Sequence, residues 1–228
     1  MAKETLVLLP GVLSDKRVWS HQASHLADLV DCQIIPLTTN NTMQDLAQTV
    51  LEQIKGNFYL AGHSMGGWLA LELARMVPER ILKLCLLNTS AEPDSTEKRQ
   101  NRIEMMDSVA KGGFRAIAQD IAQRYVYNRM VKEEVFSMFL RVGEQAFLNQ
   151  EQILLTRQES QSFLSQLSIP TLIIHAKQDQ VFSLAVHQEL VDKIPNAKLA
   201  IIEDCGHMSP IESPQTITAF LRFWLSYF

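Results

Sequence analysis

The sequence predicts an α/β fold, with a mostly parallel sheet of about six strands flanked by helices. Two observations carry this prediction: short apolar runs alternate with helical patterns along the chain, and the runs are apolar at consecutive positions. Continuous apolar runs indicate strands buried on both faces, as in a parallel sheet that helices cover on both sides. Six strands are too few for an eight-stranded barrel, so we expect a doubly wound open sheet.

The predicted strands are short, and the first of them ends at a turn signal. Residues 5–9 (TLVLL) are apolar after Thr5 and stop at Pro10-Gly11, a dipeptide that favours a turn. Residues 32–37 (CQIIPL) form a weaker run. The remaining four apolar runs cover residues 58–61, 81–87, 171–175 and 198–202.

Helical patterns fill most of the gaps between these runs. The expected helices cover residues 18–29, 43–55, 65–76, 184–194 and 214–227. The last helix has the clearest start, because Ser213 suits the N-cap and Pro214 suits the first turn. Its apolar residues recur at helical spacing and should pack on the sheet: Ile217, Phe220, Leu221 and Trp224.

Residues 91–167 break the alternation of strands and helices. This segment contains no convincing strand, only helical stretches with a break at Gly112-Gly113. A long helical insertion between two sheet strands predicts a cap over the carboxyl edge of the sheet. We therefore expect residues 1–90 and 168–228 to form the core and residues 91–167 to form the cap, within one compact unit.

The composition limits which binding partners and which cellular compartment we expect. The chain has 21 basic and 25 acidic side chains, a net charge of −4, which gives no reason to expect nucleic acid or an anionic membrane as partner. We expect no secretory signal, and no apolar segment reaches the roughly 18 to 20 residues that span a bilayer. Three scattered cysteines form no CxxC pair, so we expect a reducing cytoplasm.

A nucleophile motif stands between the third apolar run and the helix that follows it. Residues 62–66 (GHSMG) match G-x-S-x-G, and the strand before and helix after are the context that this motif requires. Such a turn strains the serine's own dihedral angles and sets the Ser64 hydroxyl at a helix N-terminus, where developing negative charge is favoured. The alternative is a glycine-rich turn in which Ser64 only caps the helix.

A base and an acid follow in the chain order that this motif predicts. His207 lies in the loop between the last apolar run and the last helix, whereas the other histidines lie in predicted strands or helices or inside the motif. Asp179 follows the penultimate run and would fix the imidazole tautomer. Asp204 is the rival acid, and the alternative role for Asp179 is to cap the next helix.

Two backbone N–H groups should stabilise the tetrahedral intermediate. One is the N–H of Met65, directly after the serine. The other should come from the loop after the first strand, where we expect Val12 first and Leu13 second. No cluster of histidine, cysteine or acidic residues has metal-ligand spacing, so we expect neither a metal nor a cofactor.

Taken together, the Pro-Gly loop, GHSMGG, IPTLIIHAKQD and the CGH loop resemble the α/β-hydrolase superfamily, particularly its small cofactor-free serine esterases and lactonases. The resemblance covers essentially the whole chain. It implies a cap inserted after the fold's sixth-strand position, a small-molecule substrate, and a monomer or homodimer. Two departures stand out: Pro10-Gly11 replaces the usual His-Gly, and the first two strands of larger members are missing.

We expect a serine hydrolase that cleaves a small to medium, partly apolar ester through an acyl-enzyme on Ser64. A lactone, a methyl ester or a thioester would suit the same chemistry. The candidates for substrate contact are Leu13, Trp68, Phe136 and Phe139.

Three alternatives stay open. The same triad serves lyases of the menaquinone pathway, in which an arginine often follows the glycine pair where this chain has Trp68, and it serves carbon–carbon hydrolases. A third alternative is a member that binds a ligand without catalysis.

Arg157 has two possible roles. It would either fasten the cap, which we favour, or bind a carboxylate of the substrate.

Overall fold

The computed structural model describes residues 3–228 and contains one sheet of six parallel strands. The strands are β1 (Thr5–Leu9), β2 (Asp31–Ile34), β3 (Phe58–His63), β4 (Ile81–Leu87), β5 (Thr171–Ala176) and β6 (Lys198–Ile202). Their order across the sheet is β2-β1-β3-β4-β5-β6. The predicted six-stranded parallel sheet is confirmed, and the second strand stops two residues before Pro36, which has no N–H to donate to a neighbour.

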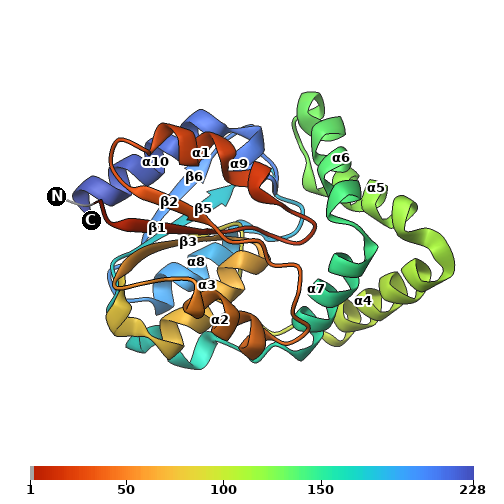
Figure 1. Ribbon diagram of the computed structural model, residues 1–228, viewed down its shortest axis with the longest axis horizontal. Helices are drawn as coiled ribbons and strands as arrows, with labels where there is room; N and C mark the ends of the chain where they lie inside the picture. Colours follow the sequence, from red (N-terminus) through yellow and green to blue (C-terminus); the bar gives the residue numbers. More distant parts are fainter. Residues whose placement is uncertain (1–2) are drawn as a thin grey trace.

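Helices cover both faces of this sheet (Figure 1). On one face lie α1 (Ser20–His25) and α10 (Pro214–Tyr227), with the short α9 (Ser209–Glu212) beside them. On the other face lie α2 (Met43–Glu52), α3 (Met65–Met76) and α8 (Leu184–Lys193). The sheet and its two helical layers enclose the apolar core, in which residues of β4 and β5 are buried on both faces.

The structure differs from the sequence prediction at the first helix and agrees with it at the last. The predicted helix over residues 18–29 is shorter: a 3₁₀ turn over Lys16–Trp19 comes first, and α1 ends at His25. The Asp15 side chain accepts from the Arg17 N–H and so starts that turn before the expected helix. In α10, Ile217, Leu221 and Trp224 are buried against the core as their spacing predicts.

Four helices lie between β4 and β5 and contain no strand among them. They are α4 (Thr96–Ser108), α5 (Phe114–Tyr125), α6 (Lys132–Val142) and α7 (Glu144–Thr156). We call them the helical insertion. Figure 1 shows them grouped at the end of the sheet toward which the strands run, while both termini lie at the opposite end. The turn from α4 to α5 is at Val109–Gly113, where Gly112 adopts a φ of 87°, a conformation that favours glycine.

Short 3₁₀ turns complete the chain path, at Pro78–Arg80, Arg129–Val131 and Gln161–Gln166. Across residues 3–228, no helix combines the length and the apolar character that crossing a lipid bilayer requires.

Candidate active site

Ser64 stands alone between β3 and α3, in a sharp turn. Its backbone has φ 54° and ψ −117°, a strained conformation for a residue with a side chain. Gly66 allows the turn to approach its neighbours, because a Cβ there would lie 2.3 Å from the Leu9 carbonyl oxygen. The sequence therefore forms a strand–turn–helix with a strained serine at its corner, as the motif predicts.

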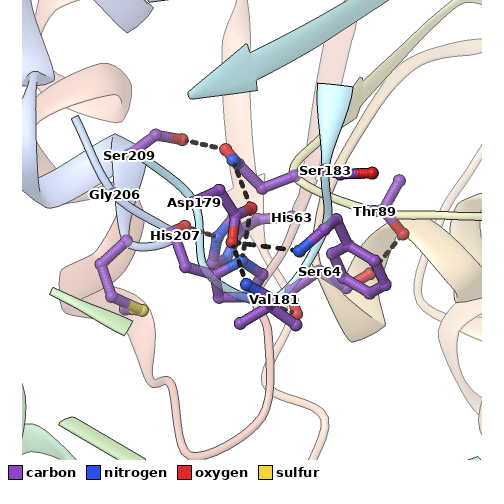
Figure 2. A network of polar contacts seen from close by, with 12 residues as sticks. His63, Ser64, Thr89, Asp179, Val181, Ser183, Gly206, His207 and Ser209 are labelled. Atoms are coloured by element: carbon purple, nitrogen blue, oxygen red, sulfur yellow. Dashed lines mark hydrogen bonds and ion pairs between the residues drawn. The ribbon is translucent and has the colours of Figure 1, made fainter. Parts of the chain in front are cut away.

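Three side chains from three separate loops meet above this turn (Figure 2). The His207 Nε2 lies 2.9 Å from the Ser64 Oγ, and the His207 Nδ1 lies 2.9 Å from the Asp179 Oδ2. His207 and Asp179 side chains are fully buried, and Ser64 is 7% exposed. In this geometry the imidazole Nδ1–H donates to the carboxylate, which leaves Nε2 free to accept the serine's proton.

Asp179 is held as an anion by its surroundings. Its Oδ2 also accepts from the Asn88 side-chain amide at 2.8 Å, and its Oδ1 accepts from the backbone N–H of Val181 at 2.7 Å. Burial alone would raise the pKa of Asp179, but the His207 ring and these hydrogen bonds outweigh burial and lower it to about 2. The rival acid, Asp204, is exposed.

The backbone around His207 is fixed from two sides. The His207 N–H donates to the Tyr125 carbonyl at 2.8 Å, and the His63 Nε2–H donates to the His207 carbonyl at 2.7 Å. The buried Glu212 carboxylate accepts from the backbone N–H of Met208 at 3.0 Å and from that of Tyr127 at 2.8 Å. The loop that carries the histidine is thus tied both to the serine's turn and to the end of α5.

The loop after β1 lies against the serine. A Cβ on Gly11 would lie 3.0 Å from the Ser64 Cβ, so this backbone passes directly beside the nucleophile. Gly11 and Val12 are buried and their N–H groups have no hydrogen-bond acceptor within residues 3–228, whereas the Leu13 N–H donates to the Gln150 side chain. Met65 is the first residue of α3, so its N–H has no partner within the helix. The oxyanion-hole role of the Val12 and Met65 N–H groups stays a prediction.

Comparison with known proteins places the chain in a family. The model of the family described as "Alpha/beta hydrolase family" matches residues 6–220. The chain belongs to the alpha/beta hydrolase family. The fold agrees with this: a thermophilic esterase from Thermogutta terrifontis superposes with a TM-score of 0.89 at 27% identity, over 98% of this chain and 90% of that one.

Other relatives of this alpha/beta hydrolase differ in their described activities. A pimeloyl-[acyl-carrier protein] methyl ester esterase of Aromatoleum aromaticum is 25% identical over 97% of this chain and 98% of its own length. MenH from S. aureus shares the fold, with a TM-score of 0.88 at 20% identity, over 99% of this chain and 94% of that one. The family match thus fixes the fold and the family, while the described activities of these relatives differ.

The four side chains predicted to touch substrate lie in different surroundings in this alpha/beta hydrolase. Leu13 and Phe139 are fully buried. Trp68 is buried beneath the Arg157 guanidinium, whose central carbon lies 3.5 Å from the centroid of the indole. Phe136 lines a cavity on the insertion together with Arg115 and residues of α5. Their contact with substrate stays a prediction.

Two aromatic side chains that the sequence reasoning missed cover His207. The Tyr125 ring lies 4.5 Å from the His207 ring between centroids, and the Phe182 ring lies 5.8 Å from it. Phe182 follows Asp179 by three residues, so its position in the acid's loop was a usable signal. Tyr125 ends α5, and nothing in the sequence linked that helix end to His207.

Beyond these two rings lies a cavity of about 220 Å³, between α4, α5 and the loop that carries Asp179. Its lining combines apolar and polar side chains: Asp94, Lys98, Asn101, Arg102, Met105, Ile121, Arg124, Tyr125, Glu151, Gln180, Val181 and Phe182. We call it the insertion cavity. Because Tyr125 and Phe182 line it and also pack on His207, the cavity borders the triad.

A buried ionic network forms one wall of the insertion cavity. Arg102 bridges Asp94 and Glu151 at 2.6 and 2.7 Å, and Arg157 binds Asp94 at 2.7 Å. These contacts use the Arg157 guanidinium within the protein, which favours fastening of the insertion over recognition of a substrate carboxylate. Among residues 3–228, no three histidine, cysteine or acidic side chains are arranged to hold a metal ion.

Proposed function

We propose that this alpha/beta hydrolase is a serine esterase that cleaves a small to medium, partly apolar ester through an acyl-enzyme on Ser64. The observation that carries the proposal is the continuous contact from the Ser64 hydroxyl through the His207 ring to the Asp179 carboxylate, with both distances at 2.9 Å. A serine hydroxyl becomes a useful nucleophile when a neutral imidazole accepts its proton at hydrogen-bond distance.

In the proposed reaction, His207 acts first as a base and then as an acid. Its Nε2 takes the Ser64 proton while Oγ bonds to the ester carbonyl carbon, and the carbonyl oxygen gains the negative charge. The N–H groups of Val12 and Met65 stabilise that charge, and Asp179 stabilises the imidazolium. The carbonyl re-forms as the C–O bond to the alcohol breaks, and the imidazolium gives the departing oxygen its proton. A water molecule then releases the acid by the same steps.

The insertion cavity supports the proposed substrate class. Its volume of about 220 Å³ suits a small ligand, and Met105, Ile121 and Phe182 provide apolar surface. Polar side chains such as Asn101 and Gln180 offer hydrogen bonds to a part of the substrate. Tyr125 and Phe182 line this cavity and also contact the His207 ring, so a substrate bound here lies close to the proposed base.

A panel of p-nitrophenyl esters tests the proposed function. We expect release of p-nitrophenol from the acetate and the butyrate, with an initial burst that reports the acyl-enzyme, and no turnover by Ser64→Ala. Lactones and thioesters assayed in parallel would define the preferred bond. A protein that hydrolyses none of these substrates while binding them unchanged would support the ligand-binding alternative. Elimination without any hydrolysis, seen with lyase substrates, would support the lyase alternative.

A further inference from the structure

Gln150 joins the helical insertion to the loop beside the nucleophile. It lies on α7 and its side chain is fully buried. Its Oε1 accepts from the Leu13 N–H at 2.9 Å, and its Nε2 donates to the Leu37 carbonyl at 2.8 Å. A buried amide is costly when its groups lack partners, so this glutamine is tolerated because both ends are bonded.

The loop that Gln150 holds is strained. Leu13 has a φ of 55°, in the left-handed region that a residue with a side chain rarely adopts, and its side chain is fully buried. Two further bonds shape the loop: Ser14 donates from its N–H to the Gly11 carbonyl at 3.3 Å and from its Oγ to the Val12 carbonyl at 3.2 Å. A strained backbone persists when its surroundings hold it, and Gln150 supplies the long-range contact.

The bond to Gln150 also decides which N–H of the loop stays available. With the Leu13 N–H engaged, two N–H groups of this buried loop, those of Gly11 and Val12, have no hydrogen-bond acceptor in the described part of the chain, and Val12 is the one bonded directly to Leu13. Its neighbour Gly11 lies against the Ser64 Cβ. A donor kept free of protein acceptors beside the nucleophile is what a developing oxyanion requires.

We propose that Gln150 is the positioning residue of the oxyanion loop, and that it holds Leu13 so that the Val12 N–H is presented to the tetrahedral intermediate. This inference rests on the proposed esterase function. Gln150 acts through the backbone of another segment and does not touch the reacting atoms. Gln150 should therefore help to stabilise the transition state, in which the substrate oxygen carries negative charge. It should have little effect on binding of the uncharged ester.

Gln150→Leu tests the inference, because leucine fills the space and removes both hydrogen bonds. We expect kcat for p-nitrophenyl butyrate to fall about 10- to 100-fold with KM within about twofold of wild type. The inhibition constant of a trifluoromethyl ketone, which forms a charged tetrahedral adduct on the serine, should rise in parallel. A merely structural role would not single out the charged adduct.

Asn149→Leu is the matched control. Asn149 is the neighbouring residue on α7 and donates to the Thr38 carbonyl at 3.2 Å, so its removal breaks a similar tie without touching the loop after β1. We expect kcat, KM and the inhibition constant of Asn149→Leu to stay within about twofold of wild type. Should Gln150→Leu fail to fold, Gln150→Met, which keeps the length of the side chain, is measured in its place.

Two outcomes separate this inference from the function on which it rests. A wild-type protein that does not hydrolyse p-nitrophenyl esters overturns the proposed function. An active wild type, with a folded Gln150 variant whose kcat and ketone inhibition match those of Asn149→Leu, overturns the role of Gln150 and leaves the esterase proposal standing.

Discussion

At the scale of single residues, the hydrogen bonds that converge on Asp179 determine which nitrogen of His207 carries the proton. The carboxylate accepts from the ring, from Asn88 and from two backbone N–H groups, those of Val181 and Phe182. An asparagine at position 179 could present its amide N–H toward the ring instead, and the ring would then keep its proton on Nε2. The base would be lost while the packing stayed intact.

We therefore expect Asp179→Asn to lower kcat by about 10⁴-fold, with KM little changed. The measurement is steady-state hydrolysis of a p-nitrophenyl ester. Asp204→Asn is the control, because Asp204 is exposed and should leave kcat within about twofold. If the two substitutions had the opposite effects, the catalytic acid would be Asp204 and not Asp179.

The three triad candidates could be found from the sequence because each follows the end of a strand, and the ends of parallel strands meet at one edge. The same rule would have found Asn88, which follows β4 and donates to Asp179 at 2.8 Å. It could not find Tyr125 or Gln150. Both lie on helices of the insertion, and their contacts with the site depend on how those helices pack.

At the scale of the elements, the ionic network fastens the helical insertion to the segment that returns to the sheet. Arg157 and Asp94 are 5% and 3% exposed, and the guanidinium also stacks on Trp68 of α3. Removing one partner of a buried pair leaves the other charge uncompensated. The stability of the folded protein should therefore depend on each charged side chain of this network.

Arg157→Leu should lower the free energy of unfolding by about 3 to 5 kcal/mol, measured by urea denaturation. The control is Arg222→Leu, since the Arg222–Asp28 pair is exposed and should contribute at most about 1 kcal/mol. If Arg157 instead binds a carboxylate of the substrate, Arg157→Leu should leave the free energy of unfolding unchanged. It should then raise KM only for esters that carry a carboxylate.

The two rings over His207 predict a change in substrate range. Phe182→Ala should join the insertion cavity to the site, and the ratio of kcat/KM for p-nitrophenyl octanoate to that for the acetate should rise about tenfold. Phe223→Ala, on the exposed face of α10, is the control and should leave the ratio unchanged. An unchanged ratio in Phe182→Ala would show that the acyl chain does not bind in this cavity.

The helices and strands of the core could be predicted from periodicity, because continuous apolar runs and helical spacing directly reflect burial. The helical character of residues 91–167 could be predicted as well, including the break at Gly112-Gly113. The arrangement of the four insertion helices could not, since it depends on side chains that meet across long sequence distances, such as Arg102 with Glu151.

At the scale of the whole molecule, buried neutral histidines couple stability to pH. Burial lowers the pKa of His63 to about 3 and that of His187 to about 4. His187 accepts from the Thr89 N–H, and the Thr89 hydroxyl donates to the Ser64 carbonyl. Both rings are therefore held uncharged beside the nucleophile turn.

The sign of the pH dependence follows from proton binding. Below the ordinary histidine pKa of 6.5, the unfolded chain binds protons at these rings and the folded protein does not. The contribution of these two uncharged rings to the free energy of unfolding is thus complete above pH 6.5. It falls as the pH drops toward 4, by about 1.4 kcal/mol per pH unit for each histidine. Urea denaturation at pH 7 and at pH 5 measures this loss, and His187→Gln should reduce it. Equal stability at both pH values would contradict the buried neutral rings.

The proposed function requires Ser64 to be an activated nucleophile, and covalent labelling tests this requirement. A fluorophosphonate probe should add to the intact protein once, with the mass shift located on Ser64 by peptide mapping. Ser64→Ala should take up no label, and His207→Ala should react far more slowly. A wild-type protein that stays unlabelled, or carries the label on another residue, would show that Ser64 is not the nucleophile.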